Sequence, residues 1–208
     1  YIEGFYIRPR IDLDLLRAHS EGLIGLSACL AGEIPRRIIN GDYDGAKAYA
    51  LEMRDILGEG NFYLELQDHG IPDQTIVNRA LLRMHNETGI PLVCTNDAHY
   101  LTRQDAAIQD VLMCIQMGKT VEDPNRMRFE TQEFYLKSEQ EMAALFPDWP
   151  EALENTAKIA ADCNVDFQFG VYHLPEFKLP PGYTDGDAYF ETLCRQGFAR
   201  RYPQGSEE

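Results

Sequence analysis

The sequence predicts an α/β fold in which short parallel strands alternate with amphipathic helices. Three short apolar runs, at residues 23–28, 62–66 and 92–95, have the length and composition of buried strands. Between and after these runs, apolar residues recur at helical spacing. Because consecutive parallel strands need a crossover connection, usually a helix, this alternation indicates a series of βα units.

The helical segments have recognisable beginnings and ends. Helices are predicted over residues 44–57 and 72–88, each followed by a glycine, and four more begin near residues 102, 138, 150 and 185. Thr102 with Asp105, and Ser138 with Glu141, have the spacing of capping boxes. Ile108, Val111, Leu112 and Ile115 form the apolar stripe of the helix that begins near residue 102. In the last helix, Phe190, Leu193, Cys194 and Phe198 are expected to point inward.

The proline-rich stretch at residues 166–184 cannot form a regular helix and is interpreted as a linker. It divides the chain into a βα segment over residues 1–165 and a final helical segment over residues 185–208. Because the chain starts at Tyr1, inside a well-patterned region, we expect it to be a piece of a longer protein.

The composition excludes several classes of protein. The chain has 208 residues and a net charge of −15, the sign opposite to that of a phosphate-binding surface, so it is not expected to be a main DNA-gripping element. Its five cysteines are widely spaced without a Cys-x-x-Cys pair, which disfavours a disulfide framework or a zinc ribbon. With no signal peptide and no membrane-spanning run in the sequence, we expect a cytoplasmic protein.

Polar side chains follow all three predicted strands. Cys29 follows the first strand, Gln67-Asp68-His69 the second, and Asn96-Asp97-Ala98-His99 the third. In parallel βα architectures, functional groups gather at the carboxyl ends of the strands. We therefore expect a functional site at this edge of the predicted sheet.

Asp97 and His99 are the sharpest pair of candidate metal ligands. In an extended segment, residues two apart point to the same side, so the carboxylate and the imidazole can bind one divalent ion. A turn-capping aspartate with a surface histidine is the alternative, and spacing alone does not separate the two. Cys29 is a further candidate ligand, although its residue pattern favours a buried structural cysteine.

Glu65 and His69 are secondary candidates for the same site. Glu65 points either into the site or across to a helix, and His69, directly before Gly70, has the position of a turn-stabilising histidine. The chain has no Gly-x-Ser-x-Gly elbow and no glycine-rich phosphate loop. No catalytic residue is therefore assigned within it.

Five stretches together resemble the DnaE-type alpha subunit of bacterial DNA polymerase III. They are GLIGLSACLAGEIP at residues 22–35, YLELQDHG at 63–70, GIPLVCTNDAHY at 89–100, GKTVEDPNRMRF at 118–129 and FYLKS at 134–138. The resemblance extends from about residue 3 to residue 202. It implies that residues 1–165 are the carboxyl-terminal part of a PHP (polymerase and histidinol phosphatase) domain, a partial irregular βα barrel, and that residues 185–208 begin the polymerase core region.

The resemblance also implies a chemistry. PHP domains that keep their site hold divalent metal ions (zinc, manganese or magnesium), and the matching ligands here are Cys29, Asp97 and His99. The parent would be a DNA-directed DNA polymerase that acts on DNA and deoxynucleotides, with a sliding clamp and a proofreading subunit as partners. Some members use the PHP site for 3′→5′ exonucleolytic proofreading, whereas in others it is a scaffold for a separate proofreading subunit.

Much of the family's machinery is expected outside this chain, upstream of Tyr1 or downstream of Glu208. The ligand set in the chain is therefore incomplete, and we expect weak metal binding and neither nuclease nor polymerase activity from the chain by itself. Open sheet edges are expected to make it self-associate. A stand-alone metal-dependent phosphoesterase of the wider PHP superfamily and a non-catalytic scaffold remain as alternatives.

Overall fold

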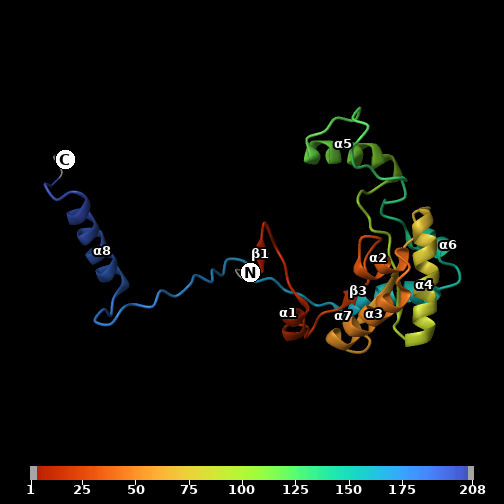
Figure 1. Ribbon diagram of the computed structural model, residues 1–208, viewed down its shortest axis with the longest axis horizontal. Coiled ribbons are helices and arrows are strands. Elements are labelled where there is room, and N and C mark those ends of the chain that lie inside the picture. Colours follow the sequence, from red (N-terminus) through yellow and green to blue (C-terminus); the bar gives the residue numbers. More distant parts are fainter. Residues whose placement is uncertain (1–3, 206–208) are drawn as a thin grey trace. The chain divides into compact units, whose positions relative to one another are not determined.

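A computed structural model describes residues 4–205 of the chain (Figure 1). The outermost residues of the two predicted terminal segments, 1–3 and 206–208, lie outside the described residues. The chain divides into two compact units, Tyr1–Asn164 and Val165–Glu208. Among the described residues, no helix has the length and apolar character needed to cross a membrane.

The first unit is built on a three-stranded parallel sheet. Strands β3 (Gly25–Leu26), β4 (Phe62–Leu66) and β5 (Leu92–Cys94) lie in the order β3-β4-β5, with Gly25 opposite Phe62 and Leu64 opposite Leu92. All three strands lie within the predicted apolar runs, although β3 is only two residues long, and the predicted α/β class is confirmed. Within the described part of the chain the strands do not close into a barrel.

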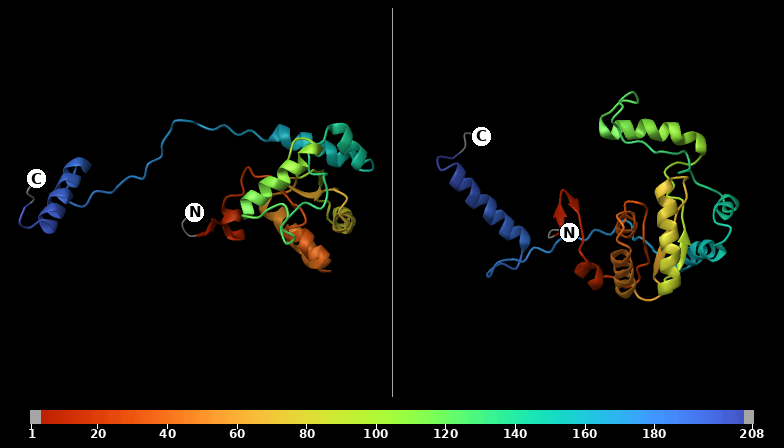
Figure 2. Two further views of the ribbon diagram at one scale, coloured as in Figure 1. Left: turned by 90° about the horizontal axis from the view of Figure 1, so that it is seen from above. Right: turned by 45° about the vertical axis from the view of Figure 1, so that its right-hand side comes forward.

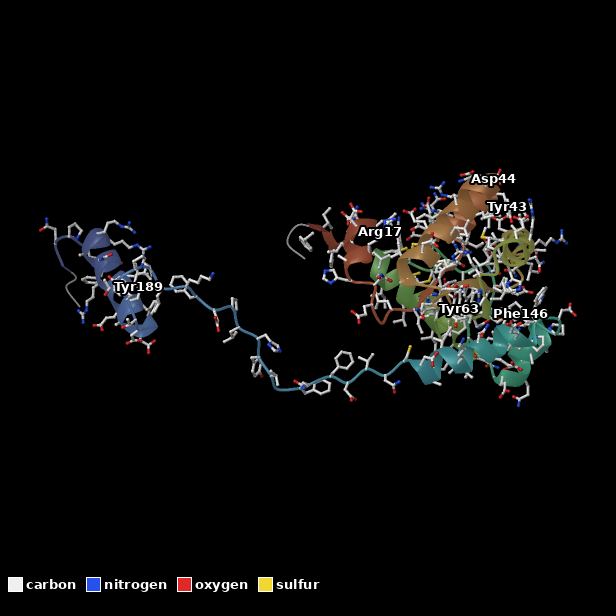
Figure 3. All side chains as sticks on the ribbon, turned by 90° about the horizontal axis from the view of Figure 1, so that it is seen from below. Arg17, Tyr43, Asp44, Tyr63, Phe146 and Tyr189 are labelled. Atoms are coloured by element: carbon white, nitrogen blue, oxygen red, sulfur yellow. The ribbon has the colours of Figure 1, made fainter. Side chains whose placement is uncertain are left out.

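Helices α2 (Glu33–Ile39), α3 (Tyr43–Leu57) and α4 (Pro72–Thr88) pack together beside the sheet (Figures 1 and 2). The first turn of α3, where Figure 3 labels Tyr43 and Asp44, is capped by Asp42, which accepts a hydrogen bond from the Gly45 N–H. The helix α4 ends at Gly89 in the left-handed conformation, with φ of 72°. The side chains that fill the core include Ile34, Leu64, Leu66, Val77, Leu81, Met84 and Ile90.

Helix α7 (Pro150–Asp162) packs against the edge strand β5. The Asn155 side chain donates a hydrogen bond of 2.8 Å from Nδ2 to the Leu92 carbonyl, which is thereby paired although no further strand of residues 4–205 lies beside β5. A helix thus packs beside this edge strand and pairs one of its carbonyls, whereas the expected self-association of the chain stays a prediction.

Both predicted capping boxes are present, but one predicted stripe is not buried. Asp105 accepts from the Thr102 N–H before α5 (Ala106–Met117), and Ser138 and Glu141 cap α6 (Glu139–Leu145). On α5, however, Ile115 is 71% exposed, and Ile108, Val111 and Leu112 are exposed as well. The stripe is exposed because α5 projects away from the sheet, so only Met113 and Cys114 of this helix are buried (Figures 1 and 2).

The N-terminal part of the first unit contains elements that the sequence patterns did not reveal. Strands β1 (Phe5–Tyr6) and β2 (Arg8–Pro9) form an antiparallel pair, and α1 (Leu13–Ala18) follows them. Asp12 caps α1 by accepting from the Leu15 N–H at 2.8 Å. Each of these elements is too short to produce a clear hydrophobic period.

The second unit consists of an exposed proline-rich stretch and helix α8 (Gly186–Arg201). The helix forms as predicted and is capped by Asp185, but it has no buried residue, so the expectation that Phe190, Leu193, Cys194 and Phe198 point into a core is wrong. Within residues 165–205, α8 has no second helix or strand to cover that face. The ring of Tyr189, labelled in Figure 3, contacts the rings of Tyr183 and Phe177, with centroids 4.6 and 5.9 Å away.

Candidate metal site at the strand ends

The carboxyl ends of the three parallel strands are connected through the side chain of Glu65. Its Oε2 accepts a hydrogen bond of 3.0 Å from the Ala28 N–H, directly after β3. Its Oε1 accepts from the Thr95 hydroxyl, directly after β5, and from Gln67 Nε2 at 3.2 Å. The Glu65 N–H in turn donates to Ser27 Oγ at 2.8 Å. Of the two orientations left open by the sequence, Glu65 therefore takes the one toward the strand ends.

Cys29 is half-buried at the end of β3. It follows Ala28, whose φ of 65° places a non-glycine residue in the left-handed region. Cys29, Glu65 and Gln67 line a small cavity of about 10 Å³. This cavity has room for at most about one water molecule.

Asp97 and His99 face each other in the segment after β5. The distance from Asp97 Oδ1 to His99 Nε2 is 3.4 Å, and both side chains are a little more than one third exposed. The two side chains are on the same side, but the geometry differs from the expected extended segment, because Asp97 has a φ of 43°. A left-handed turn brings the pair together, and aspartate tolerates this conformation better than most residues.

His69 is buried, with 1% of its surface exposed, and both of its ring nitrogens have partners inside the protein. Nε2 lies 2.8 Å from the Asn96 carbonyl oxygen, and Nδ1 lies 2.7 Å from Gln74 Nε2. A carbonyl only accepts and an amide nitrogen only donates, so the proton is on Nε2 and the ring is neutral. Burial lowers the pKa of His69, which favours this neutral form.

The environment of His69 favours a structural role for this residue. Its N–H donates to Gln74 Oε1 at 2.8 Å, and its ring stacks on Phe134 with a centroid distance of 3.9 Å. With the Nδ1 lone pair occupied by Gln74, the ring offers no free nitrogen to a metal ion. His69 instead holds the carbonyl of Asn96, the residue before Asp97.

A second set of contacts holds the side chain of Asn96. Lys137, whose side chain is 3% exposed, donates to Asn96 Oδ1 at 3.2 Å and lies 3.3 Å from Glu133 Oε2. Asn96 Nδ2 donates to the carbonyls of Glu133 at 3.0 Å and Tyr135 at 2.6 Å. Lys137 and Glu133 were not among the predicted site residues, because no local pattern relates them to Asn96, about forty positions away in the sequence.

Aromatic rings border the exposed pair. The His99 ring centroid lies 4.7 Å from that of Phe129 and 5.9 Å from that of Phe134, and the His99 N–H donates to the Phe134 carbonyl at 2.8 Å. These contacts fix the position of the His99 backbone and limit the orientation of its ring. The FYLKS stretch at residues 134–138, which is distant in the sequence, thus contacts the candidate site.

The predicted ligands are only partly brought together. Among residues 4–205, no group of three or more His, Cys, Asp and Glu side chains is placed to hold a metal ion. The pair Asp97 and His99 has the carboxylate and imidazole donors that zinc and manganese accept, and the Cys29 thiolate is a donor for zinc. The donor chemistry fits a divalent ion, whereas the described geometry supplies a pair and a separate thiol.

Comparison with known proteins connects these features to a family. A family described as "PHP domain" matches residues 1–69. The chain is 48% identical over 204 residues to the DNA polymerase III subunit alpha of Borreliella burgdorferi, covering 97% of the chain and 18% of that protein. The subunits of Treponema pallidum and Thermus aquaticus are 43% and 44% identical over 208 and 209 residues, covering 100% and 98% of the chain and 18% and 17% of those proteins.

The chain thus spans less than one fifth of the length of these relatives. The matches nevertheless extend through both of its structural units, from the strand ends to α8. The resemblance predicted from the five sequence stretches is therefore confirmed: over nearly its whole length, this chain is similar to one segment of the DNA polymerase III alpha subunit.

Proposed function

We propose that the chain is a segment of a replicative DNA-directed DNA polymerase, which extends DNA from deoxynucleotides. The observation that supports this most strongly is the identity of 43–48% to three polymerase III alpha subunits along nearly the whole chain. The same observation favours a polymerase over a stand-alone phosphoesterase. The partners implied for the whole protein are a sliding clamp and a proofreading subunit.

Within that protein, we assign residues 1–165 to the carboxyl-terminal part of a PHP domain with a partial barrel. Residues 166–184 are a linker, and residues 185–208 begin the polymerase region. The open three-stranded parallel sheet and the PHP match at residues 1–69 support the first assignment. The exposed proline-rich stretch supports the second.

The strand-end residues supply part of a divalent metal site in this proposal. Cys29, Asp97 and His99 are the ligands from this chain, while Glu65 and His69, which are hydrogen-bonded within the protein, support them. A bound divalent ion would activate water and neutralise charge on a scissile phosphate, the chemistry needed for 3′→5′ exonucleolytic cleavage. The chain's own part is to hold the Asp97 carboxylate and the His99 imidazole side by side, next to the ring of Phe129.

By itself, the chain should bind metal weakly and hydrolyse no DNA. Two facing donors and one separate thiol leave most of the coordination shell of an ion to water. The net charge of −15 also opposes binding of a polyanion. The cleavage activity and the polymerase activity therefore belong to the whole protein.

Calorimetric titration of zinc and manganese into the purified chain tests the site. We expect binding by the wild type, loss of binding in an Asp97→Ala, His99→Ala double variant, and retention in an Asp14→Ala, His19→Ala control that removes an exposed aspartate and histidine from the α1 region. Equal binding by both double variants would contradict the assignment of ligands. Absence of specific binding by the wild type would mean either that ligands outside this chain are indispensable or that the site is only structural.

A further inference from the structure

Glu65 occupies the position that joins the two halves of the proposed metal site. It lies on the central strand β4, between the strand end that bears Cys29 and the one that bears Asp97 and His99. We propose that Glu65 is a positioning residue, which holds the Cys29 turn and the segment after β5 in one arrangement. This inference rests on the proposed function and adds to it the residue that couples the ligands.

The contact with the Cys29 turn is made to a strained residue. Ala28 has a φ of 65°, a conformation that is unfavourable for residues with a Cβ atom. Its N–H donates to Glu65 Oε2 at 3.0 Å, a hydrogen bond strengthened by the negative charge of the carboxylate. The carboxylate thus compensates for an unfavourable backbone conformation directly before Cys29.

The contact with the other half is made through Thr95. The Thr95 hydroxyl donates to Glu65 Oε1, and the Thr95 N–H donates to the Leu66 carbonyl at 3.1 Å. Thr95 is therefore attached to β4 by both side chain and backbone. Thr95 is the last residue hydrogen-bonded to β4 before the segment that contains Asn96, Asp97 and His99.

The hydrogen bonds of Glu65 also distinguish positioning from direct ligation. Oε2 is used by Ala28, and Oε1 is used by both Thr95 and Gln67. A metal ion bound to Oε2 would compete with the Ala28 N–H, and one bound to Oε1 would compete with the Thr95 hydroxyl. Of the donors to Glu65, Gln67 Nε2 also donates to Thr95 Oγ1 at 3.0 Å. Glu65 is accordingly assigned to holding the ligands rather than to binding the ion.

Cobalt(II) titration followed by absorption spectroscopy tests this inference, because thiolate ligation gives a charge-transfer band that a change in stability alone does not remove. In the wild type we expect this band, and its absence in Cys29→Ser assigns it to Cys29. In Glu65→Gln, which keeps the shape but loses the charge and one acceptor oxygen, we expect the band to fall at least about tenfold. Glu59→Ala, at an exposed position, is the control.

Amide hydrogen exchange of the metal-free protein supplies a second readout. We expect the Ala28 N–H to exchange at least about tenfold faster in Glu65→Gln than in the wild type, with the thermal unfolding of the variant still cooperative. An unchanged charge-transfer band, or unchanged exchange at Ala28, would overturn the positioning role. Absence of any cobalt binding by the wild type would instead count against a metal site formed by this chain's own residues, and Ala28 exchange would still decide the role of Glu65.

Discussion

Replacement of His69 by alanine should destabilise the first unit substantially. The substitution removes two hydrogen bonds of the ring, to Asn96 and Gln74, each contributing about 0.5–1.5 kcal/mol. It also removes the stacking on Phe134, about 0.5–1.5 kcal/mol, and leaves the buried Gln74 amide without one partner, at a cost of about 1–3 kcal/mol. Since such contributions are not additive, the expected loss in the free energy of unfolding is about 3–5 kcal/mol.

Urea denaturation followed by circular dichroism measures this loss. The midpoint should fall for His69→Ala with little change in the slope, because the same surface is exposed on unfolding. His19→Ala, which removes an exposed histidine, should change the free energy of unfolding by no more than about 0.5 kcal/mol. A loss below about 1 kcal/mol for His69→Ala would refute the interpretation of His69 as a buried anchor.

The pH dependence provides an independent check on the same residue. Burial lowers the pKa of His69 in the folded state below its ordinary value of 6.5, so the unfolded chain binds this proton more readily. The stability that depends on neutral His69 is therefore complete above pH 6.5 and is lost as the pH falls below it. A His69→Gln variant should lose this part of the pH dependence between pH 7 and 5.

Three further predictions concern packing, capping and thiols. Leu81→Ala should cost about 2–5 kcal/mol in urea denaturation because Leu81 is fully buried, whereas Ile115→Ala should cost no more than about 0.5 kcal/mol; equal losses would contradict the exposure of α5. The pKa of Glu141 is lowered to about 2, chiefly by the hydrogen bond from the Tyr135 hydroxyl, so this carboxylate stabilises the fold above pH 4.5 and does so less as the pH falls toward 2. Glu141→Gln should thus lower the melting temperature at pH 6 but not at pH 2, and equal shifts at both would refute this. Burial raises the pKa of the Cys94 thiol to about 12, so Cys94 should react with iodoacetamide at least about tenfold more slowly than exposed Cys163, as peptide mass spectrometry can measure.

The strands and helix ends were predictable from the sequence because their signals are local. The apolar runs at 62–66 and 92–95 became β4 and β5, and the capping boxes at Thr102 and Ser138 mark helix starts in the structure. A capping residue and the N–H groups it satisfies lie within one turn, so the chain itself contains the whole interaction. Predictions of this type needed no knowledge of the tertiary structure.

The burial of helix faces could not be predicted in the same way. A helical period identifies an apolar face, as with Ile115 on α5 and Phe198 on α8, but not the element that would cover it. The helix α2 was missed because it is only seven residues long and has Pro35 in its first turn, where proline is tolerated. Short helices of this kind are stabilised by packing, which depends on the rest of the fold.

The candidate site, too, could be predicted only in part from local sequence patterns. Asp97 and His99 were identified from their position after a strand, although a left-handed turn rather than an extended segment brings them together. The support of Asn96 by Lys137 joins residues that are far apart in the chain, and only the fold reveals it. The tautomer of His69 likewise follows from partners on another segment.

The most direct test of the account is X-ray absorption at the zinc edge of the zinc-loaded wild-type chain. If Cys29, Asp97 and His99 contribute ligands to one ion, the spectrum should contain one sulfur neighbour at about 2.3 Å together with nitrogen and oxygen neighbours at about 2.0–2.2 Å. The sulfur neighbour should disappear in Cys29→Ser, and the imidazole signal should disappear in His99→Ala. A zinc ion surrounded by oxygen alone, with a spectrum unchanged in both variants, would contradict a metal site at the strand ends.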